Sequence, residues 1–70
     1  MKGVFADNLK AERKNKGFTQ TTISQQLKIG VKRYAAWEEG RSTPNLSHLT
    51  TVCEILSIDD LYLFITKKLA

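Results

Sequence analysis

Hydrophobic residues recur three and four positions apart along most of the chain, which is the spacing of one face of an α-helix. No segment alternates cleanly between apolar and polar residues over six positions, and hairpin dipeptides such as Asn-Gly are absent. The pattern therefore predicts an all-α fold. Isolated helices of this length are unstable in water, so packing must hold them together. The five expected helices are short and cover about residues 4–16, 19–27, 31–39, 46–56 and 60–68.

Residues that begin or end helices punctuate this pattern at the expected places. Basic residues precede Gly17 at the end of the first segment, which is typical of a helix C-terminus. Thr19 and Asn45 are suitable N-caps for the second and fourth helices. Gly40 closes the third helix, and Pro44 prevents its continuation.

Only three residues, 28–30, separate the second and third helices, so the chain must turn sharply between them. Two helices joined in this way, over about residues 19–39, form a helix-turn-helix, whose second helix can enter the major groove of DNA. At about 100° per residue, Tyr34 and Trp37 mark the buried side of that helix. The opposite side presents Lys32, Ala36 and Glu39, with Ala35 beside them and Arg33 on one flank.

Positive charge is concentrated in the first two thirds of the chain. The 70 residues carry a net charge of +4, but residues 1–44 hold nine basic and four acidic residues, a net +5. Residues 45–70 hold two basic and three acidic residues, a net −1. This asymmetry indicates a half that faces a polyanion. On charge alone, a merely solvated surface is an equally good interpretation.

The composition argues against several classes of function. Cys53 is the single cysteine and His48 the single histidine, which falls short of the four ligands of a structural zinc site and excludes an internal disulfide. These two residues lie five apart on one expected helix, so they do not face each other as nucleophile and base. We therefore expect no enzyme activity, cofactor, metal or small-molecule substrate.

The chain also lacks the features of a membrane or secreted protein. Its longest apolar run, Leu61 to Ile65, is far shorter than the roughly 20 residues that span a bilayer. The N-terminus meets a charge before a signal-peptide core can form. With one unpaired thiol, the expectation is a soluble protein of a reducing cytoplasm, without membrane contact.

The motifs together resemble the Cro/phage-repressor (XRE-like) family of helix-turn-helix domains, from about Phe5 to Phe64. Two features at a fixed separation carry the resemblance. They are the Thr19-Gln20 start of the second helix and the close of the third, Trp37-Glu38-Glu39-Gly40 followed by Pro44. The resemblance implies a single domain over residues 1–70, built as a compact five-helix bundle of the phage-repressor type.

The resemblance also implies roles for individual residues. The base-contacting positions are Val31, Lys32 and Ala36, with Ala35 near them. The phosphate-contacting positions are Thr19 and Gln20 at the start of the second helix and Arg41, Ser42 and Thr43 after the third. Arg33, on the flank of the third helix, is expected to hold a phosphate, whereas a phosphate contact or plain solvation remains the alternative for Lys32. Arg13 and Glu38 match a buried or half-buried structural salt bridge between the first and third helices.

Two positions depart from the family pattern. Lys28 stands in the turn where glycine is usual, and a left-handed conformation costs a lysine about 1 kcal/mol or more. Gly30 stands where a serine or threonine usually caps the third helix, so no side chain is available there for the cap. Outside these positions, Tyr34 and Trp37 are expected in the core and His48 at the solvent.

The last segment is apolar on more sides than one core-facing stripe needs. If Leu61, Phe64 and Ile65 face the core, Tyr62 and Leu63 are exposed, which indicates a symmetric homodimer interface. A monomer with two exposed apolar side chains is the alternative. Together with the resemblance, the sequence thus predicts a sequence-specific double-stranded DNA-binding transcriptional regulator of a bacterium or phage, a repressor that binds a palindromic operator. The alternative function is a protein-interaction module, such as an antitoxin or anti-repressor, that uses this apolar surface.

Overall fold

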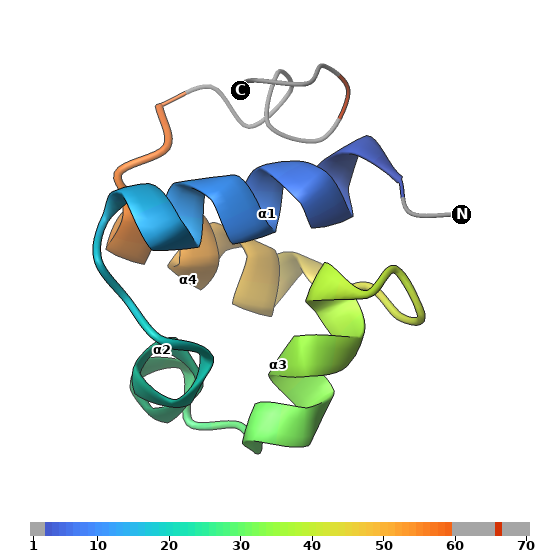
Figure 1. The fold of residues 1–70 in the computed structure, drawn as a ribbon, viewed down its shortest axis with the longest axis horizontal. Coiled ribbons are helices and arrows are strands. Elements are labelled where there is room, and N and C mark those ends of the chain that lie inside the picture. Colours follow the sequence, from blue (N-terminus) through green and yellow to red (C-terminus); the bar gives the residue numbers. More distant parts are fainter. Residues whose placement is uncertain (1–2, 60–65, 67–70) are drawn as a thin grey trace.

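The structure is a computed structural model that describes residues 3–59 and residue 66. These residues contain four helices and no strand: α1 (Val4–Asn15), α2 (Gln20–Leu27), α3 (Val31–Glu38) and α4 (Leu46–Leu56). In Figure 1, α1 and α4 run across the upper part of the fold, while α2, seen almost end-on, and α3 lie below them. α3 packs against both α1 and α2, and α2 also contacts α4.

The all-α prediction is confirmed for the described residues. The four helices begin and end within one residue of the ranges expected from the hydrophobic spacing, or at the residue after an expected cap. Four described helices do not make the predicted five. The fifth expected helix, residues 60–68, lies outside the described residues except for Thr66, and so do Tyr62 and Leu63.

Polar caps fix where these short helices begin and end. The Thr19 hydroxyl oxygen accepts the backbone N–H of Thr22 at 3.0 Å, and the Asn45 side-chain oxygen accepts that of His48 at 2.8 Å. After α1, Gly17 adopts a positive φ of 80°. The N–H groups of Gly17 and Phe18 donate to the carbonyls of Lys14 and Arg13 in the last turn of the helix. The predicted N-caps of α2 and α4 and the glycine terminator of α1 are therefore confirmed.

All four helices contribute to one hydrophobic core. Its two largest side chains, Trp37 and Tyr34, are 1% and 0% exposed, as the spacing along α3 predicts. Their rings meet edge to face with centroids 5.8 Å apart, a favourable aromatic geometry. The expectation for His48 was wrong, because its ring lies half-buried 5.7 Å from Trp37. The core cluster consists of Leu9, Ile23, Leu27, Tyr34, Trp37, Val52, Cys53 and Leu56.

The turn between α2 and α3 keeps a tight geometry even though it contains no glycine at its left-handed position. Lys28 adopts φ 60° and ψ 41° there, which sequence reasoning identified as the strained position. Its N–H donates to the carbonyl of Gln25 at 3.1 Å, and the N–H of Ile29 donates to that of Ser24 at 3.0 Å. These two hydrogen bonds close α2 and set the direction in which α3 begins.

We expect Lys28→Gly to stabilise the domain. Glycine adopts the left-handed conformation without steric cost, so the substitution removes roughly 1 kcal/mol of strain, partly offset by the greater entropy of the unfolded chain. The matched control is Lys16→Gly, because Lys16 is exposed, carries the same charge and ends α1 in a right-handed conformation. Urea unfolding should show a higher midpoint for Lys28→Gly and a lower one for Lys16→Gly; a lower midpoint for both would contradict the strain argument.

Candidate nucleic-acid interface

The first turn of α3 is the most exposed part of that helix. Val31 is 40% exposed, and Lys32 and Arg33 beside it are also exposed. Ala35 and Ala36, in the middle of the helix, are half-buried. Because Tyr34 and Trp37 anchor the opposite side in the core, the N-terminal end of α3 lies farthest from α1 (Figure 1). A helix end presented in this way can reach the edges of base pairs in a groove.

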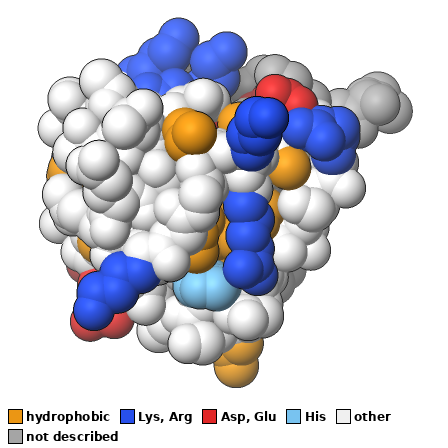
Figure 2. Space-filling view, turned by 90° about the horizontal axis from the view of Figure 1, so that it is seen from below, with side chains coloured by type: hydrophobic (Ala, Val, Ile, Leu, Met, Phe, Trp, Pro, Cys, Tyr) orange, Lys and Arg blue, Asp and Glu red, His pale blue; other side chains and the backbone are white. Residues whose placement is uncertain are grey.

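Figure 2 looks at the side of the molecule that carries α2 and α3. Lys and Arg side chains lie around much of this face, and acidic side chains lie mainly near its edges. Much of the surface between them consists of uncharged polar side chains and backbone, with small apolar areas. Basic side chains distributed around a face in this way favour contact with a polyanion.

The start of α2 offers its backbone to an anion rather than its side chains. The Thr19 hydroxyl caps the helix and donates to the Thr22 hydroxyl at 2.8 Å. The Gln20 side-chain nitrogen donates to Glu38 Oε1 at 3.1 Å, so it is engaged inside the domain. The first N–H groups of a helix have no partner within the helix and favour phosphate. The backbone N–H groups at Thr19 and Gln20 are therefore the candidates for phosphate contact in this conformation.

The loop after α3 is tied back to that helix. The N–H groups of Arg41 and Ser42 both donate to the Ala36 carbonyl, at 3.0 and 3.4 Å. The side chains of Arg41, Ser42 and Thr43 are exposed. Arg41 is also engaged, because its Nε donates to Glu39 Oε1 at 2.7 Å. The structure thus places three candidate phosphate contacts together beyond the end of α3, but with one of them in an ion pair.

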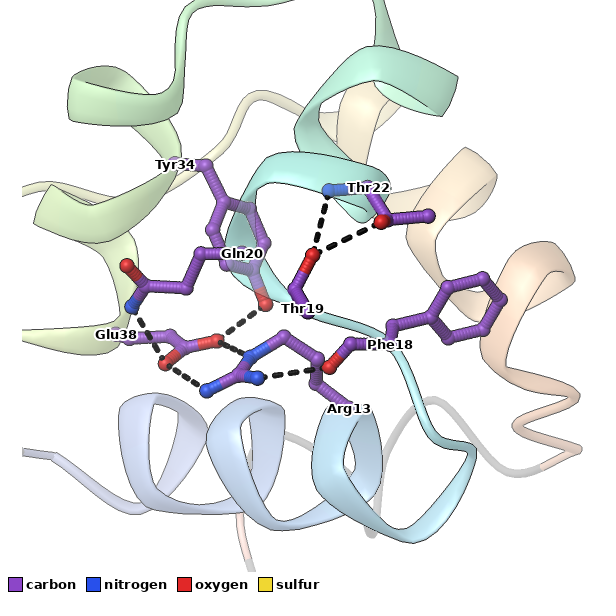
Figure 3. Close-up of polar contacts among 7 residues, drawn as sticks. All are labelled: Arg13, Phe18, Thr19, Gln20, Thr22, Tyr34 and Glu38. Atoms are coloured by element: carbon purple, nitrogen blue, oxygen red, sulfur yellow. Dashed lines mark hydrogen bonds and ion pairs between the residues drawn. The ribbon is translucent and has the colours of Figure 1, made fainter.

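A buried polar network joins α1, α2 and α3 behind this face (Figure 3). Arg13 and Glu38 form a two-point ion pair, Nε to Oε2 at 2.6 Å and Nη2 to Oε1 at 3.2 Å, and the two side chains are 10% and 2% exposed. The Tyr34 hydroxyl donates to Glu38 Oε2 at 2.5 Å, and Arg13 Nη1 donates to the Phe18 carbonyl at 2.8 Å. With Gln20, four donors from three helices surround one carboxylate, which fixes the orientation of α3.

The network keeps Glu38 ionised despite its burial. Burial raises the pKa of Glu38, but the hydrogen bonds from Arg13, Tyr34 and Gln20 together hold it below its ordinary value of 4.5. The hydrogen bond to Glu38 raises the pKa of Arg13, against the lowering effect of burial. Burial, and then the bond to Glu38, raises the pKa of Tyr34. All three groups therefore hold fixed protonation states at neutral pH.

A family model described as a helix-turn-helix domain matches residues 6–69 of the chain. The chain belongs to this helix-turn-helix family. Searches of the curated proteins and of the solved structures each returned no match. Membership indicates a DNA-binding regulator, in agreement with the basic face that carries α2 and α3.

Two further findings concern metal binding and membranes, in the part of the chain that the structure describes. Residues 3–59 and 66 contain no group of three or more His, Cys, Asp or Glu side chains that could bind a metal ion. Among the same residues, no helix is long and apolar enough to cross a membrane.

Sequence reasoning missed two of the donors to Glu38, and also the Phe18 carbonyl that accepts from Arg13. Tyr34 was assigned to the core on spacing alone, although it lies four residues before Glu38, where one helical turn brings the two side chains together. That spacing is a signal that could have identified the bond. Gln20 lies 18 residues from Glu38 in sequence, so nothing local indicates its contact. The network therefore depends on how the helices pack, which periodicity does not encode.

Proposed function

We propose that the domain is a double-stranded DNA-binding transcriptional regulator of the Cro/phage-repressor type, which places the N-terminal half of α3 in the major groove. The observation that carries the proposal is the exposed, basic first turn of α3 on a rigid support. Lys32 and Arg33 lie at the free end of the helix, while Tyr34 and Trp37 hold its other side in the core. A helix fixed in this way can be docked in a groove without first losing conformational entropy.

The exposed groups of α3 divide into base and phosphate contacts in this proposal. Lys32 reaches guanine O6 and N7, while Val31, Ala35 and Ala36 offer apolar contact to thymine methyl groups. Arg33 holds the backbone from the flank. Because this helix has no Asn or Gln, few bidentate contacts are available and the shape of the DNA contributes to recognition.

Phosphate contacts on both sides of α3 fix its position along the groove. On one side they come from the backbone at Thr19 and Gln20, and on the other from Arg41, Ser42 and Thr43. The support for this assignment is the exposure of the loop residues and the unused N–H groups of the α2 terminus.

We further propose that two copies act together as a cytoplasmic repressor. A homodimer through residues 60–68, with Tyr62 and Leu63 at the contact, would place two recognition helices about 34 Å apart on a palindromic operator. The apolar surplus of that segment in the sequence supports this arrangement. Sedimentation at micromolar concentration tests it: we expect about twice the chain mass, and a species of only 7.9 kDa would exclude the dimer.

Binding to a random DNA duplex at several salt concentrations tests the proposed function. We expect log affinity to fall linearly with log salt, by about 0.9 per phosphate neutralised. Arg33→Ala should reduce the slope by about 0.9, which corresponds to one phosphate contact. The control is Lys10→Ala, which removes the same charge from an exposed residue of α1. Because α1 makes none of the proposed contacts, the slope should stay unchanged. A flat salt response would instead favour a protein-interaction module.

Once DNA binding is established, selection of bound sequences from random DNA would give the operator and its half-site spacing.

A further inference from the structure

We propose that Glu39 competes with DNA phosphate for Arg41 and thereby restrains the affinity of the domain for DNA of any sequence. This inference rests on the proposed function and concerns the regulation of that same site. It starts from the ion pair between Arg41 Nε and Glu39 Oε1, which measures 2.7 Å. Arg41 is a candidate phosphate contact, yet in the free domain its guanidinium already has an anionic partner.

The backbone between the two residues brings their side chains together. Glu39 is the C-cap of α3, and Gly40 follows with a positive φ of 76°, which turns the chain back. The N–H of Arg41 then donates to the Ala36 carbonyl at 3.0 Å, which fixes the start of the loop against the helix. The ion pair thus forms across a backbone reversal that is hydrogen-bonded on its own, so that it can break without unfolding the loop.

Glu39 differs from the neighbouring Glu38 in what neutralises it. Glu38 is 2% exposed and receives donors from Arg13, Tyr34 and Gln20 inside the domain, so it presents no free charge to DNA. The Glu39 side chain is 52% exposed and the Arg41 side chain 65% exposed. When a phosphate takes Arg41, Glu39 is left as an uncompensated carboxylate close to the DNA backbone.

The size of the effect follows from the exposure of the pair. An exposed ion pair is worth at most about fivefold in an equilibrium constant, and repulsion between Glu39 and phosphate adds to this. We therefore expect Glu39→Gln to raise the affinity for a random duplex by about three- to tenfold at low salt. Salt screens both terms, so the gain should shrink as the salt concentration rises and the salt dependence should become steeper.

The test measures binding of Glu39→Gln, Arg41→Ala and the double variant to one random duplex at about 50 and 200 mM salt, concentrations that separate strong from weak phosphate dependence. The control is Glu54→Gln. It removes the same charge from an exposed residue of α4, which belongs neither to α3 nor to the loop after it. We expect a gain for Glu39→Gln, little change for Glu54→Gln, and a smaller gain from Glu39→Gln once Arg41 is alanine, because only the repulsion of phosphate by Glu39 then remains. Equal unfolding midpoints for the variants would show that the fold is unchanged.

Each other outcome overturns the inference in a distinct way. Equal gains for Glu39→Gln and Glu54→Gln would mean that only net charge matters. A gain of the same size in the Arg41→Ala background would mean that Glu39 repels phosphate without acting on Arg41. A loss of affinity would mean that Glu39 orients Arg41 or accepts a hydrogen bond from cytosine. Absence of binding by the wild type and all variants would overturn the proposed function, and this inference with it.

Discussion

Replacing Glu38 with alanine is expected to lower the free energy of unfolding by about 3–5 kcal/mol, because it leaves the charge of Arg13 buried without its partner. The same substitution removes the acceptor of the Tyr34 hydroxyl and of the Gln20 amide. Domains are stable by only about 5–15 kcal/mol, and a small chain buries a smaller share of its surface than a large one, so much of the fold's stability would be lost. Urea unfolding followed by the fluorescence of Trp37, the only tryptophan, measures the change.

A double variant separates the cost of an orphaned charge from the value of the ion pair itself. Arg13→Met combined with Glu38→Leu removes both charges and keeps much of the buried volume, so it should lose far less stability than Glu38→Ala alone. Unchanged thermal stability of Glu38→Ala would contradict a structural role for the pair. A double variant as unstable as the single one would mean that the pair itself, and not the orphaned charge, supplies the stability.

The same carboxylate makes part of the stability depend on pH. Since the network holds the pKa of Glu38 in the folded state below its ordinary value of 4.5, the unfolded chain takes up the proton first as the pH falls. The contribution of ionised Glu38 to the free energy of unfolding is therefore complete above about pH 5. It is lost as the pH falls through the pKa that Glu38 has in the folded state. Glu38→Gln mimics the protonated form, so its stability deficit relative to the wild type should be largest near neutrality and shrink in acid.

The positions of the described helices could be predicted from the sequence because they follow from local rules. The spacing of apolar residues gives the buried face, and Thr19, Asn45 and Gly17 mark ends through hydrogen bonds that reach only a few residues. Lys28 is different. The three residues between the helices predict a sharp turn, but the left-handed conformation at Lys28 was expected from the family resemblance, which has glycine at this position.

Contacts between distant helices, and the choice of partner by a long exposed side chain, were not predictable in this way. The contact of Arg13 with Glu38 spans 25 residues and came from family resemblance, not from periodicity. Gln20 turned inward to the same carboxylate, which no local pattern indicates. The pairing of Arg41 with Glu39 depends on the backbone reversal at Gly40, which the spacing of apolar residues does not indicate. The assignment of DNA-contacting residues is a proposal, because these contacts form only with the bound DNA.

Trp37→Ala is the second substitution with a large expected effect, a loss of about 3–5 kcal/mol in the free energy of unfolding. Trp37 is 1% exposed, and its ring contacts Tyr34 on its own helix and His48 on α4. Truncation opens a cavity where α3 meets α4 and removes both ring contacts. Because the variant lacks the only tryptophan, circular dichroism at increasing urea is the suitable measurement. A loss below about 1 kcal/mol would mean that the packing of Trp37 contributes little to the stability of the domain.

The two large effects have different physical origins, and pH distinguishes them. The stability deficit of Trp37→Ala comes from lost apolar contact, so it should stay constant between neutral and acid pH, whereas that of Glu38→Gln shrinks.

Trp37→Phe keeps a ring in the core and should keep the fold, at a cost nearer 1–2 kcal/mol. It alters how α3 rests on α4 without touching an exposed charge. If a rigid support for α3 matters in DNA binding, this variant should bind an operator more weakly while its salt slope stays that of the wild type, because the phosphate contacts are unchanged.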